Sequence, residues 1–156
     1  MISMQEIGHV NSSFKEPEEL KVACREGRLF SAESEIVLTC GHPEMLKGLE
    51  HFSHAWILYH LHRAGRVEPV THPGPAGMKL PKAGVLASRS QYRPNHIALR
   101  LVQIVKVKEG SVKVKGLDAI DGSPVLDIKP YVPHFDLPEN PKVAEWYEGW
   151  SGGGNG

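Results

Sequence analysis

Proline and glycine divide this chain into short segments. The 156 residues include twelve prolines and sixteen glycines, and no stretch before Pro141 keeps a helical spacing of apolar residues over three turns. Short apolar runs between turn residues are typical of β-strands, whereas a long helix needs an uninterrupted periodic run. The sequence therefore predicts a mainly all-β fold.

The expected strands follow from alternating or continuous apolar runs. They are residues 2–10, 35–39, 55–62, 98–108, 111–115 and 125–129. Glu109-Gly110 joins two of these runs and predicts a hairpin turn. The run 98–108 is apolar on both faces in its middle, at Leu101, Val102, Ile104 and Val105. A strand buried on both sides favours a closed barrel or a sandwich over an open sheet.

Helices are expected only at the periphery. Pro43 and Gly48 bound a short one, and Asn140-Pro141 predicts the start of a C-terminal helix. The apolar face of that terminal helix comprises Val143, Trp146, Tyr147 and Trp150. We expect irregular chain over residues 15–30, a long loop over residues 66–84 and a flexible Gly-rich tail over residues 151–156. The predicted architecture is one small antiparallel β-barrel domain over residues 1–150, with short peripheral helices and a C-terminal helix.

Charge and cysteine content exclude several classes of protein. Eighteen basic residues balance eighteen acidic ones, so any RNA affinity must come from a local patch. Cys24 and Cys40 lack the spacing of a metal site and are too few for a disulfide framework. The longest charge-free apolar stretch, residues 52–61, is too short to span a bilayer, and no signal peptide is recognisable. The expected location is cytoplasmic, with no membrane contact.

Two polar clusters are candidates for a binding site. Residues 88–96 place Arg89, Arg93 and Asn95 on one loop, where they can contact an anion and a base or amide. The alternative is a solvated turn. Residues 116–131 form the second cluster, in which Asp127 and Lys129 are expected side by side on one inward strand face. Asp121-Gly122 in the same cluster is also explained by a plain turn.

A third cluster contains four histidines. His51, His54, His60 and His62 make a metal site conceivable, but no cysteine or carboxylate stands at ligand spacing except Glu50. We therefore expect hydrogen-bonded histidines and no metal. The sequence also lacks a Gly-x-Ser-x-Gly elbow, a Gly-x-Gly-x-x-Gly turn and a Walker loop, which argues against the usual hydrolase and nucleotide-binding folds.

Taken together, four ordered blocks resemble the TrmO, or TsaA-like, family of tRNA methyltransferases. The blocks are Ile7-Gly8-His9-Val10 with Ser13-Phe14-Lys15, then residues 48–58, then Arg89-Ser90 with Arg93-Pro94-Asn95, and finally residues 117–131. The resemblance implies a small antiparallel barrel that binds S-adenosylmethionine without a Rossmann fold and works as a homodimer. It also implies methyl transfer to N6 of threonylcarbamoyladenosine beside the anticodon of tRNA.

The resemblance assigns residues to two parts of a site. The implied S-adenosylmethionine contacts are Glu26, Gly27, Arg28, His62, Arg63, Arg89, Leu99, Lys115, Gly116, Leu117 and Asp118. The residues implied around the acceptor base are Arg93, Asn95, Asp121, Asp127, Lys129 and Tyr131. We call these two sets the cofactor set and the acceptor set.

Roles within the acceptor set follow from the chemistry of the implied substrate. Asp127 or Asp121 is expected to accept the N6 proton, with His96 or His54 next. Lys129 is expected to pair with the threonyl carboxylate, and Arg93 with that carboxylate or a phosphate. Asn95 is expected to read the adenine edge. Tyr92 or Tyr131 is expected to stack on the ring.

The chain departs from the family pattern in three ways. His96 stands where the family usually has Pro, and Arg25-Glu26-Gly27 stands where it has a Gln-Pro-Gly-like stretch. The additional C-terminal domain of longer members is not recognisable, so we expect the barrel, the dimer or the Pro-rich loop to hold tRNA. The competing hypothesis is a barrel that binds S-adenosylmethionine or a nucleotide without catalysis, as a sensor or tRNA accessory. A metal-dependent hydrolase built on the four histidines ranks third.

Overall fold

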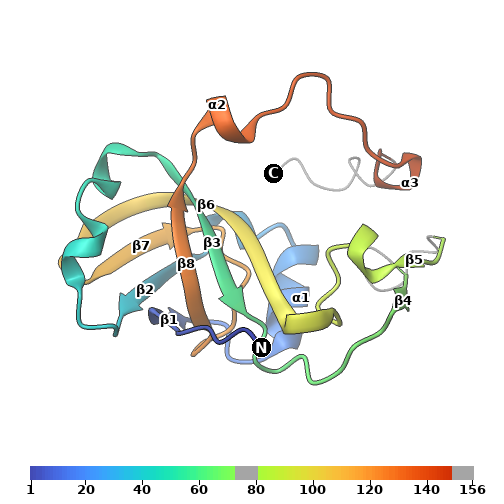
Figure 1. Ribbon diagram of the computed structural model, residues 1–156, viewed down its shortest axis with the longest axis horizontal. Helices are drawn as coiled ribbons and strands as arrows, with labels where there is room; N and C mark the ends of the chain where they lie inside the picture. The colour runs from blue at the N-terminus through green and yellow to red at the C-terminus, as the bar shows by residue number, and fades with distance from the viewer. Residues whose placement is uncertain (73–80, 149–156) are drawn as a thin grey trace.

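Six antiparallel strands close into a barrel in the computed structural model, which describes residues 1–72 and 81–148 (Figure 1). Around the barrel the order of the strands is β1-β2-β7-β6-β3-β8. Their bounds are β1 Gly8–Ser12, β2 Glu33–Leu38, β3 His54–His60, β6 Ile97–Lys108, β7 Ser111–Lys115 and β8 Pro124–Pro130. The predicted all-β barrel is confirmed, and the hairpin at Glu109-Gly110 joins β6 to β7 as expected.

Alternating side chains from every strand fill the barrel. Val10, Ile36, Ile57, Val114 and Val125 are all fully buried, one from each of five strands. Because successive residues of a strand point to opposite sides, their neighbours face outward. Two register shifts interrupt the alternation, one between β6 and β7 and one between β3 and β8. Such bulges bend the strands of a small closed barrel.

The outer face of β6 differs from the expectation of burial on both sides. Val102 is buried in the barrel, but Leu99 and Val105 on the same strand are 39% and 41% exposed. One barrel layer covers only the inner face of its strands, so these two side chains stay partly exposed on the outside. The apolar run of β6 therefore reflects core packing on one side only.

The first strand is shorter than expected. It begins at Gly8 instead of residue 2, and the residues before Ile7 are exposed. Pairing stops there because the partner strand β2 ends at Leu38, opposite Gly8. A Cβ atom on Gly8 would lie 2.2 Å from the carbonyl oxygen of Val37, so this position requires glycine.

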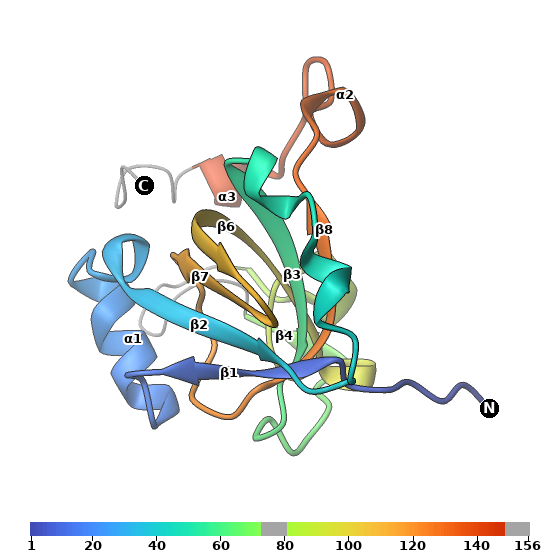
Figure 2. The ribbon, with the colours of Figure 1, turned by 90° about the vertical axis from the view of Figure 1, so that its left-hand side faces the viewer.

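A helix lies in the stretch expected to be irregular. Helix α1 spans Pro17–Arg25 between β1 and β2, and a 3-10 turn, η1, follows at Leu29–Ser31 (Figure 2). Pro17 occupies the first turn, and the Glu19 side chain accepts a hydrogen bond from the backbone N–H of Glu16 at 3.2 Å. The helix buries little more than Ala23, and its charged sequence hides the apolar stripe.

The connections contain more structure than the sequence indicates. Short 3-10 turns occur at η2 Pro43–Leu46, η3 Leu49–His51, η4 Val85–Ala87 and η5 Pro94–His96. The η2 turn lies where a short helix was expected. The stretch expected to be a long loop includes the paired strands β4 Val70–Thr71 and β5 Ala83–Gly84, which lie beside the barrel (Figure 1).

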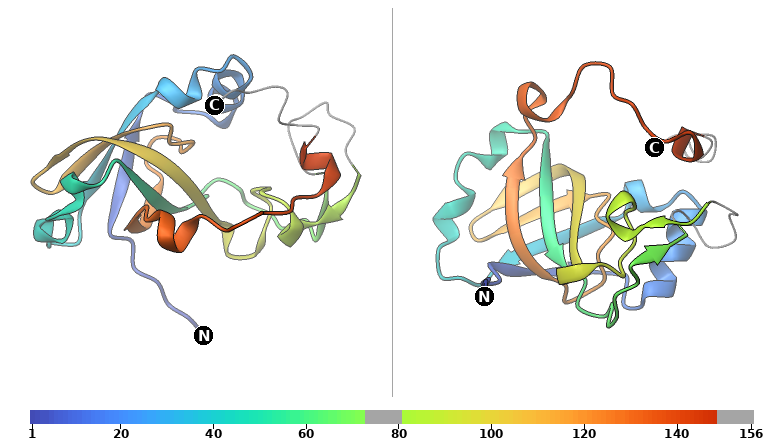
Figure 3. Two further views of the ribbon diagram at one scale, coloured as in Figure 1. Left: turned by 90° about the horizontal axis from the view of Figure 1, so that it is seen from above. Right: turned by 45° about the vertical axis from the view of Figure 1, so that its right-hand side comes forward.

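After β8 the chain leaves the barrel. It forms helix α2 at Pro133–Asp136 and, further along, helix α3 at Glu145–Glu148, on the same side of the molecule as β4 and β5 (Figure 3). The C-terminal helix thus begins four residues later than Asn140-Pro141 indicates, and Asn140 has a left-handed φ of 49° in place of the extended backbone typical of an N-cap. The rest of its expected apolar face, Trp150, and the tail at residues 151–156 lie outside the described residues. The domain boundary at residue 150 stays a prediction.

Candidate functional site at one end of the barrel

The cofactor set converges on one end of the barrel. That end is formed where β1, β3 and β7 finish and where β2, β6 and β8 begin. Glu26, Gly27 and Arg28 follow α1 there, His62 and Arg63 follow β3, and Leu99 lies near the start of β6. The turn from Lys115 to Asp118 completes the group after β7. Four segments far apart in sequence therefore meet at this end.

Arg89 reaches the same end through a hydrogen bond. Its Nη2 atom donates to the backbone oxygen of Leu99 at 2.9 Å. This contact ties the loop before β6 to the start of that strand. It also leaves the rest of an exposed guanidinium available for an anion or a ligand oxygen.

A buried tyrosine fixes Asp118 from inside the barrel. The Tyr59 hydroxyl lies 2.7 Å from Oδ1 of Asp118 and 3.0 Å from its backbone oxygen. Tyr59 is only 2% exposed, and burial, followed by the negative charge of Asp118, raises the pKa of its phenol. The hydroxyl therefore stays protonated and donates. Sequence reasoning missed Tyr59, although the alternation of β3 already places it on the same face as Ala55 and Ile57.

Arg100 supports the same turn from a neighbouring strand. Its Nε donates to the backbone oxygen of Gly116 at 2.9 Å, and its guanidinium lies 5.3 Å from the centroid of the Phe30 ring. Gly116 itself has a left-handed φ of 87°. Sequence reasoning missed Arg100 too, although a single arginine inside the apolar run of β6 is an available signal.

Two ion pairs connect three segments at this end of the barrel. They are formed by Lys15, Glu16, Arg63 and Asp121. Lys15 Nζ lies 2.9 Å from Asp121 Oδ2, and Arg63 Nη1 lies 2.9 Å from Glu16 Oε2. Asp121 Oδ1 also accepts the backbone N–H of Ser12 at 2.9 Å. The hydrogen bond from Ser12, and then that from Lys15, lower the pKa of the Asp121 carboxyl. Both carboxylate oxygens are thus engaged in holding the loop, and the role of Asp121 as a proton acceptor stays a prediction.

Gly27 and its neighbours end helix α1. The backbone N–H of Gly27 bonds to the oxygen of Cys24 at 3.2 Å, and that of Arg28 bonds to Ala23 at 2.8 Å. Gly27 has a φ of 70°, as glycine does just beyond a helix C-terminus. Glu26 pairs with Arg28 at 2.6 Å. The end of helix α1 therefore accounts for the glycine at position 27.

The loop of residues 88–96 is held by its own side chains. Arg93 Nη1 donates to the backbone oxygens of Ser88 and Ser90 at 2.9 and 3.2 Å. Asn95 and His96 both have left-handed φ values, 62° and 49°. His96 Nε2 lies 2.8 Å from the backbone oxygen of Arg66 and must donate to it, because a carbonyl only accepts. That nitrogen is therefore not available as a base.

Asp127 and Lys129 lie on the outside of the barrel, which corrects the expected inward face. Val125 is buried, so uninterrupted alternation would place Asp127 and Lys129 inside with it. The pairing instead shifts at Leu58/Tyr59, where Asp127 lies opposite Leu58 and Val125 opposite Tyr59. The extra residue turns the two charges outward. Lys129 Nζ then pairs with Asp127 Oδ2 at 3.0 Å, with side chains 65% and 44% exposed.

Aromatic side chains accompany this ion pair. Tyr131 makes edge-to-face contacts with Trp56 and His54, with ring centroids 6.2 and 6.4 Å apart. Trp56 is also the cross-strand neighbour of Lys129. Sequence reasoning did not place Trp56 in the site. The acceptor set therefore does not form one cluster: Asp127, Lys129 and Tyr131 share the outer wall of β3 and β8, whereas Asp121 anchors the barrel end.

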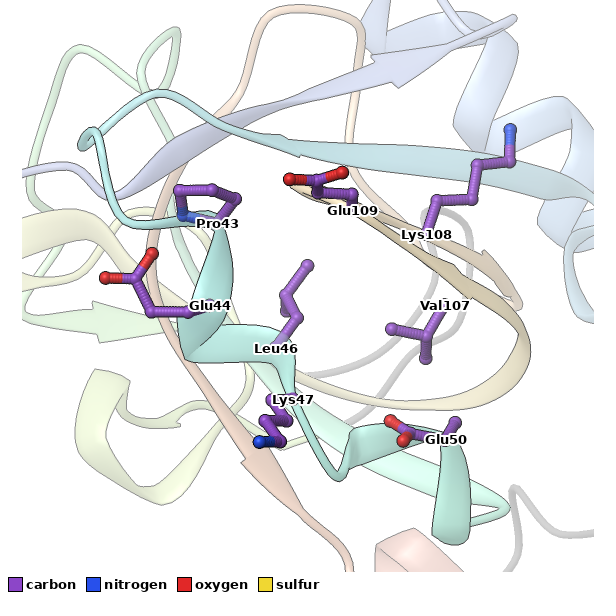
Figure 4. A pocket seen from close by; sticks show the side chains of 8 residues that line it. All are labelled: Pro43, Glu44, Leu46, Lys47, Glu50, Val107, Lys108 and Glu109. Atoms are coloured by element: carbon purple, nitrogen blue, oxygen red, sulfur yellow. The ribbon is translucent and has the colours of Figure 1, made fainter.

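Hollows on the described surface include two that lie at different places. One has a volume of about 420 Å³ and is bounded by Ser13, Phe14, Glu18, Glu19, Val22 and Arg28, so a member of the cofactor set contributes to it. The other, of about 290 Å³, lies between η2 and the β6–β7 turn and is lined by Pro43, Glu44, Leu46, Lys47, Glu50, Val107, Lys108 and Glu109 (Figure 4). No predicted site residue lines this second hollow.

The described part of the chain contains neither a metal-binding cluster nor a helix suited to a membrane. Over residues 1–72 and 81–148, no three histidine, cysteine or acidic side chains are grouped closely enough to hold a metal ion. His60 instead contacts His96 at a ring separation of 6.4 Å, and His54 Nδ1 lies 2.7 Å from the Ser53 hydroxyl. Within the same residues, no helix has the length and apolarity to cross a bilayer.

Named proteins of other organisms are similar to this chain in sequence. A protein of Pyrococcus abyssi, named "Probable S-adenosyl-L-methionine-binding protein", is 37% identical over 152 residues, covering 95% of this chain and 77% of that protein. The mouse (Mus musculus) tRNA (adenine(37)-N6)-methyltransferase is 46% identical over 98 residues, covering 63% of this chain and 23% of that enzyme.

A solved structure and a family model agree with these relatives. The crystal structure of TrmO from Pseudomonas aeruginosa matches with a TM-score of 0.73 at 30% identity, covering 93% of this chain and 62% of that one. This chain thus spans less than two thirds of the Pseudomonas chain and about a quarter of the mouse enzyme. The model described as the tRNA-methyltransferase O N-terminal domain matches residues 9–137, almost the whole barrel. The chain therefore belongs to the family of tRNA-methyltransferase O N-terminal domains.

Proposed function

We propose that this protein is an S-adenosylmethionine-dependent methyltransferase that acts on tRNA, at N6 of threonylcarbamoyladenosine beside the anticodon. The observation that carries the proposal is the convergence of the cofactor set at one barrel end, in a chain of this family. Relatives are named for S-adenosylmethionine binding and for methylation of adenine 37 of tRNA. No Rossmann turn is needed for this barrel to bind the methyl donor.

The side chains at the barrel end fit the chemistry of S-adenosylmethionine. This ligand carries an ammonium, a carboxylate, a sulfonium and an adenosine. Asp118 supplies a fixed carboxylate for a cationic group, and Arg89 supplies an exposed guanidinium for an anionic one. The backbone of Leu99 and of the turn from Lys115 to Asp118 offers donors and acceptors to the nucleoside.

The outer wall of β3 and β8 fits the acceptor nucleoside. Trp56 and Tyr131 offer aromatic faces on which an extruded adenine can stack. Lys129 is the cation for the threonyl carboxylate, and unmodified adenosine lacks the group that would draw Lys129 away from Asp127. When Lys129 turns to the substrate, its ion pair with Asp127 is released.

Released from Lys129, Asp127 is the proton acceptor of the reaction. S-adenosylmethionine supplies an electrophilic methyl group. N6 forms a bond to the methyl carbon as the carbon–sulfur bond breaks, the electron pair of that bond stays on sulfur, and the N6 proton passes to the Asp127 carboxylate. Alignment of the two reactants accounts for most of the acceleration, because neither needs a strong activating charge.

Transfer of label tests the proposal directly. The protein is incubated with methyl-labelled S-adenosylmethionine and with tRNA that carries or lacks the threonylcarbamoyl group. We expect label only in the modified tRNA. Lys129→Ala should abolish transfer while S-adenosylmethionine still binds in calorimetry, and Arg89→Ala should weaken that binding. Absence of label in modified tRNA with the unaltered protein would reject the enzyme.

A non-catalytic barrel is the second candidate. It is favoured by one observation: the Pyrococcus relative, of which this chain covers 77%, is named for binding S-adenosylmethionine and not for a reaction. In that case the same assay gives calorimetric binding of S-adenosylmethionine without any transfer of label. The two candidates therefore separate in one experiment.

The proposed working form is a homodimer. Exposed apolar side chains outside the barrel core support it: Phe135 and Leu137 are 81% and 67% exposed on the segment that leaves β8. Leu99 adds an exposed apolar side chain on β6. Sedimentation equilibrium should give twice the mass of 17.2 kDa, and a monomer at micromolar concentration would contradict this part of the proposal.

A further inference from the structure

We propose that the outer surface of the β6–β7 hairpin binds the phosphate backbone of RNA, and that it holds the tRNA substrate of the proposed reaction. Four lysines define this surface, which we call the lysine face: Lys106, Lys108, Lys113 and Lys115. The identification of the RNA as tRNA rests on the proposed function. The binding of a phosphodiester chain rests on the lysine face alone.

Strand alternation places these lysines together on the outside. In β7, Val112 and Val114 are buried in the barrel, so Lys113 and Lys115 point outward. Across the hairpin, Lys106 lies directly opposite Lys113. The hairpin, which curves along one side of the barrel in Figure 1, holds all four on paired strands about 4.8 Å apart.

The lysine face retains a positive charge after its ion pairs are counted. Glu33 and Glu35 of β2 are the acidic neighbours, at 3.8 Å from Lys113 and Lys115 and at 3.7 Å from Lys108. Exposed contacts at this distance are weak. Lys106 has no ion pair with any residue of the described chain. Four lysines face two glutamates of β2, and Glu109 in the hairpin turn adds a third carboxylate, which leaves one uncompensated positive charge in a protein whose formal net charge is zero.

Direct opposition of two lysines costs stability. Like charges at facing positions of antiparallel strands repel each other, so Lys106 and Lys113 destabilise the hairpin that carries them. A polyanion placed over the pair removes this repulsion. Lysine binds phosphate as a point charge. The side chains that define the lysine face are all cationic, so this surface suits the phosphate backbone of a nucleic acid and not its bases.

The position of the lysine face suits a tRNA substrate. Lys115 is both the last residue of β7 and the first residue of the turn that ends at Asp118, in the cofactor set. A phosphate chain that follows the hairpin is therefore led to the proposed methyl donor. The lysine face also provides the local basic patch that a chain of zero net charge needs for RNA binding.

The salt dependence of RNA binding tests the inference. The test protein carries Lys106→Gln and Lys113→Gln, and the control carries Lys21→Gln and Lys142→Gln, two exposed lysines outside the lysine face. Binding of fluorescent threonylcarbamoylated tRNA is followed by anisotropy between 50 and 200 mM KCl. Loss of two phosphate contacts should reduce the slope of log K against log [salt] by about 1.4 to 1.8. The control should keep the slope of the unaltered protein.

Stability measurements separate this role from a structural one. Because the paired lysines repel, the double variant should unfold at the same or a higher urea concentration than the unaltered protein. Weaker tRNA binding by a variant that is at least as stable cannot come from misfolding. Lower stability together with weaker binding would overturn the inference in favour of a structural role.

The results for the double variant decide whether the lysine face binds tRNA. The inference is overturned if the double variant binds tRNA with the affinity and slope of the control. It is also overturned if the lysines bind vesicles of anionic phospholipid and the substitutions abolish that binding while tRNA binding persists. A reduced slope in the double variant supports the lysine face even if no methyl group is transferred, so failure of the proposed enzyme and failure of this surface are distinguishable.

Discussion

Removing one hydroxyl group should loosen the proposed cofactor end from inside the barrel. Tyr59→Phe keeps the buried ring and deletes only the hydroxyl group that donates to Asp118. That hydroxyl lies 2.7 Å from the carboxylate oxygen of Asp118 and 3.0 Å from its backbone oxygen. Hydrogen bonds to charged groups contribute about 1.5–3 kcal/mol, so we expect a loss of about 2 kcal/mol in the free energy of unfolding. For a domain of this size that corresponds to a fall of about 4–8 °C in Tm.

The same change should weaken binding of S-adenosylmethionine. Without the hydroxyl, the Asp118 carboxylate gains rotational freedom, and the turn from Lys115 to Asp118 loses its bond to β3. Urea unfolding followed by circular dichroism gives the stability, and titration calorimetry gives the affinity. Tyr92→Phe is the matched control for stability, since the interaction assigned to Tyr92 is a stack with Arg66 at 4.3 Å from its ring centroid.

The comparison between the two variants refutes or supports the reasoning. Tyr92→Phe should change the free energy of unfolding by less than about 0.5 kcal/mol. If Tyr59→Phe unfolds at the same urea concentration as the unaltered protein and binds S-adenosylmethionine equally well, the hydroxyl does not anchor the turn. Lower stability with unchanged affinity would place Asp118 outside the cofactor contacts.

Three further changes have expected results that follow from the contacts. Asp121→Asn should lower the free energy of unfolding at neutral pH. Because the folded pKa of Asp121 is lowered, the difference from the unaltered protein should persist above about pH 4 and shrink as the pH falls through the folded pKa. Urea unfolding at several pH values tests this. Ile57→Ala empties part of a fully buried barrel position and should cost about 2–5 kcal/mol in the same assay, whereas a cost below about 1 kcal/mol would contradict the packing described. Gly116→Ala introduces a side chain at a φ of 87° and should cost about 1–2 kcal/mol by thermal unfolding, together with a lower affinity for S-adenosylmethionine.

Much of the barrel follows from local pattern. Prolines and glycines limit the length of each element, and alternation in runs such as residues 54–60 defines one buried face, so strand positions emerge from the sequence alone. Helix α1 does not emerge in this way. Four of its nine residues are charged, and it is recognised only through its capping residues and the single buried Ala23.

The candidate site, like the fold, follows from the sequence only in part. Sequence motifs select the segments that meet at the barrel end, because each polar run lies next to a strand terminus. The roles of individual residues need the three-dimensional contacts. Asp121 looks like a free carboxylate in sequence, yet its two oxygens bind Ser12 and Lys15. Tyr59 looks like a core residue, yet its hydroxyl reaches Asp118, which is 59 positions away.

The amino-acid sequence by itself determined that this protein is a mainly β domain with polar loops at its strand ends, since both properties depend on neighbours along the chain. Only the tertiary structure decided which side of the barrel Asp127 and Lys129 occupy. A shift of one residue in the pairing of β3 with β8 turns them from the core to the solvent. Strand pairing is a contact between distant segments, and a single extra residue reverses every side chain that follows it.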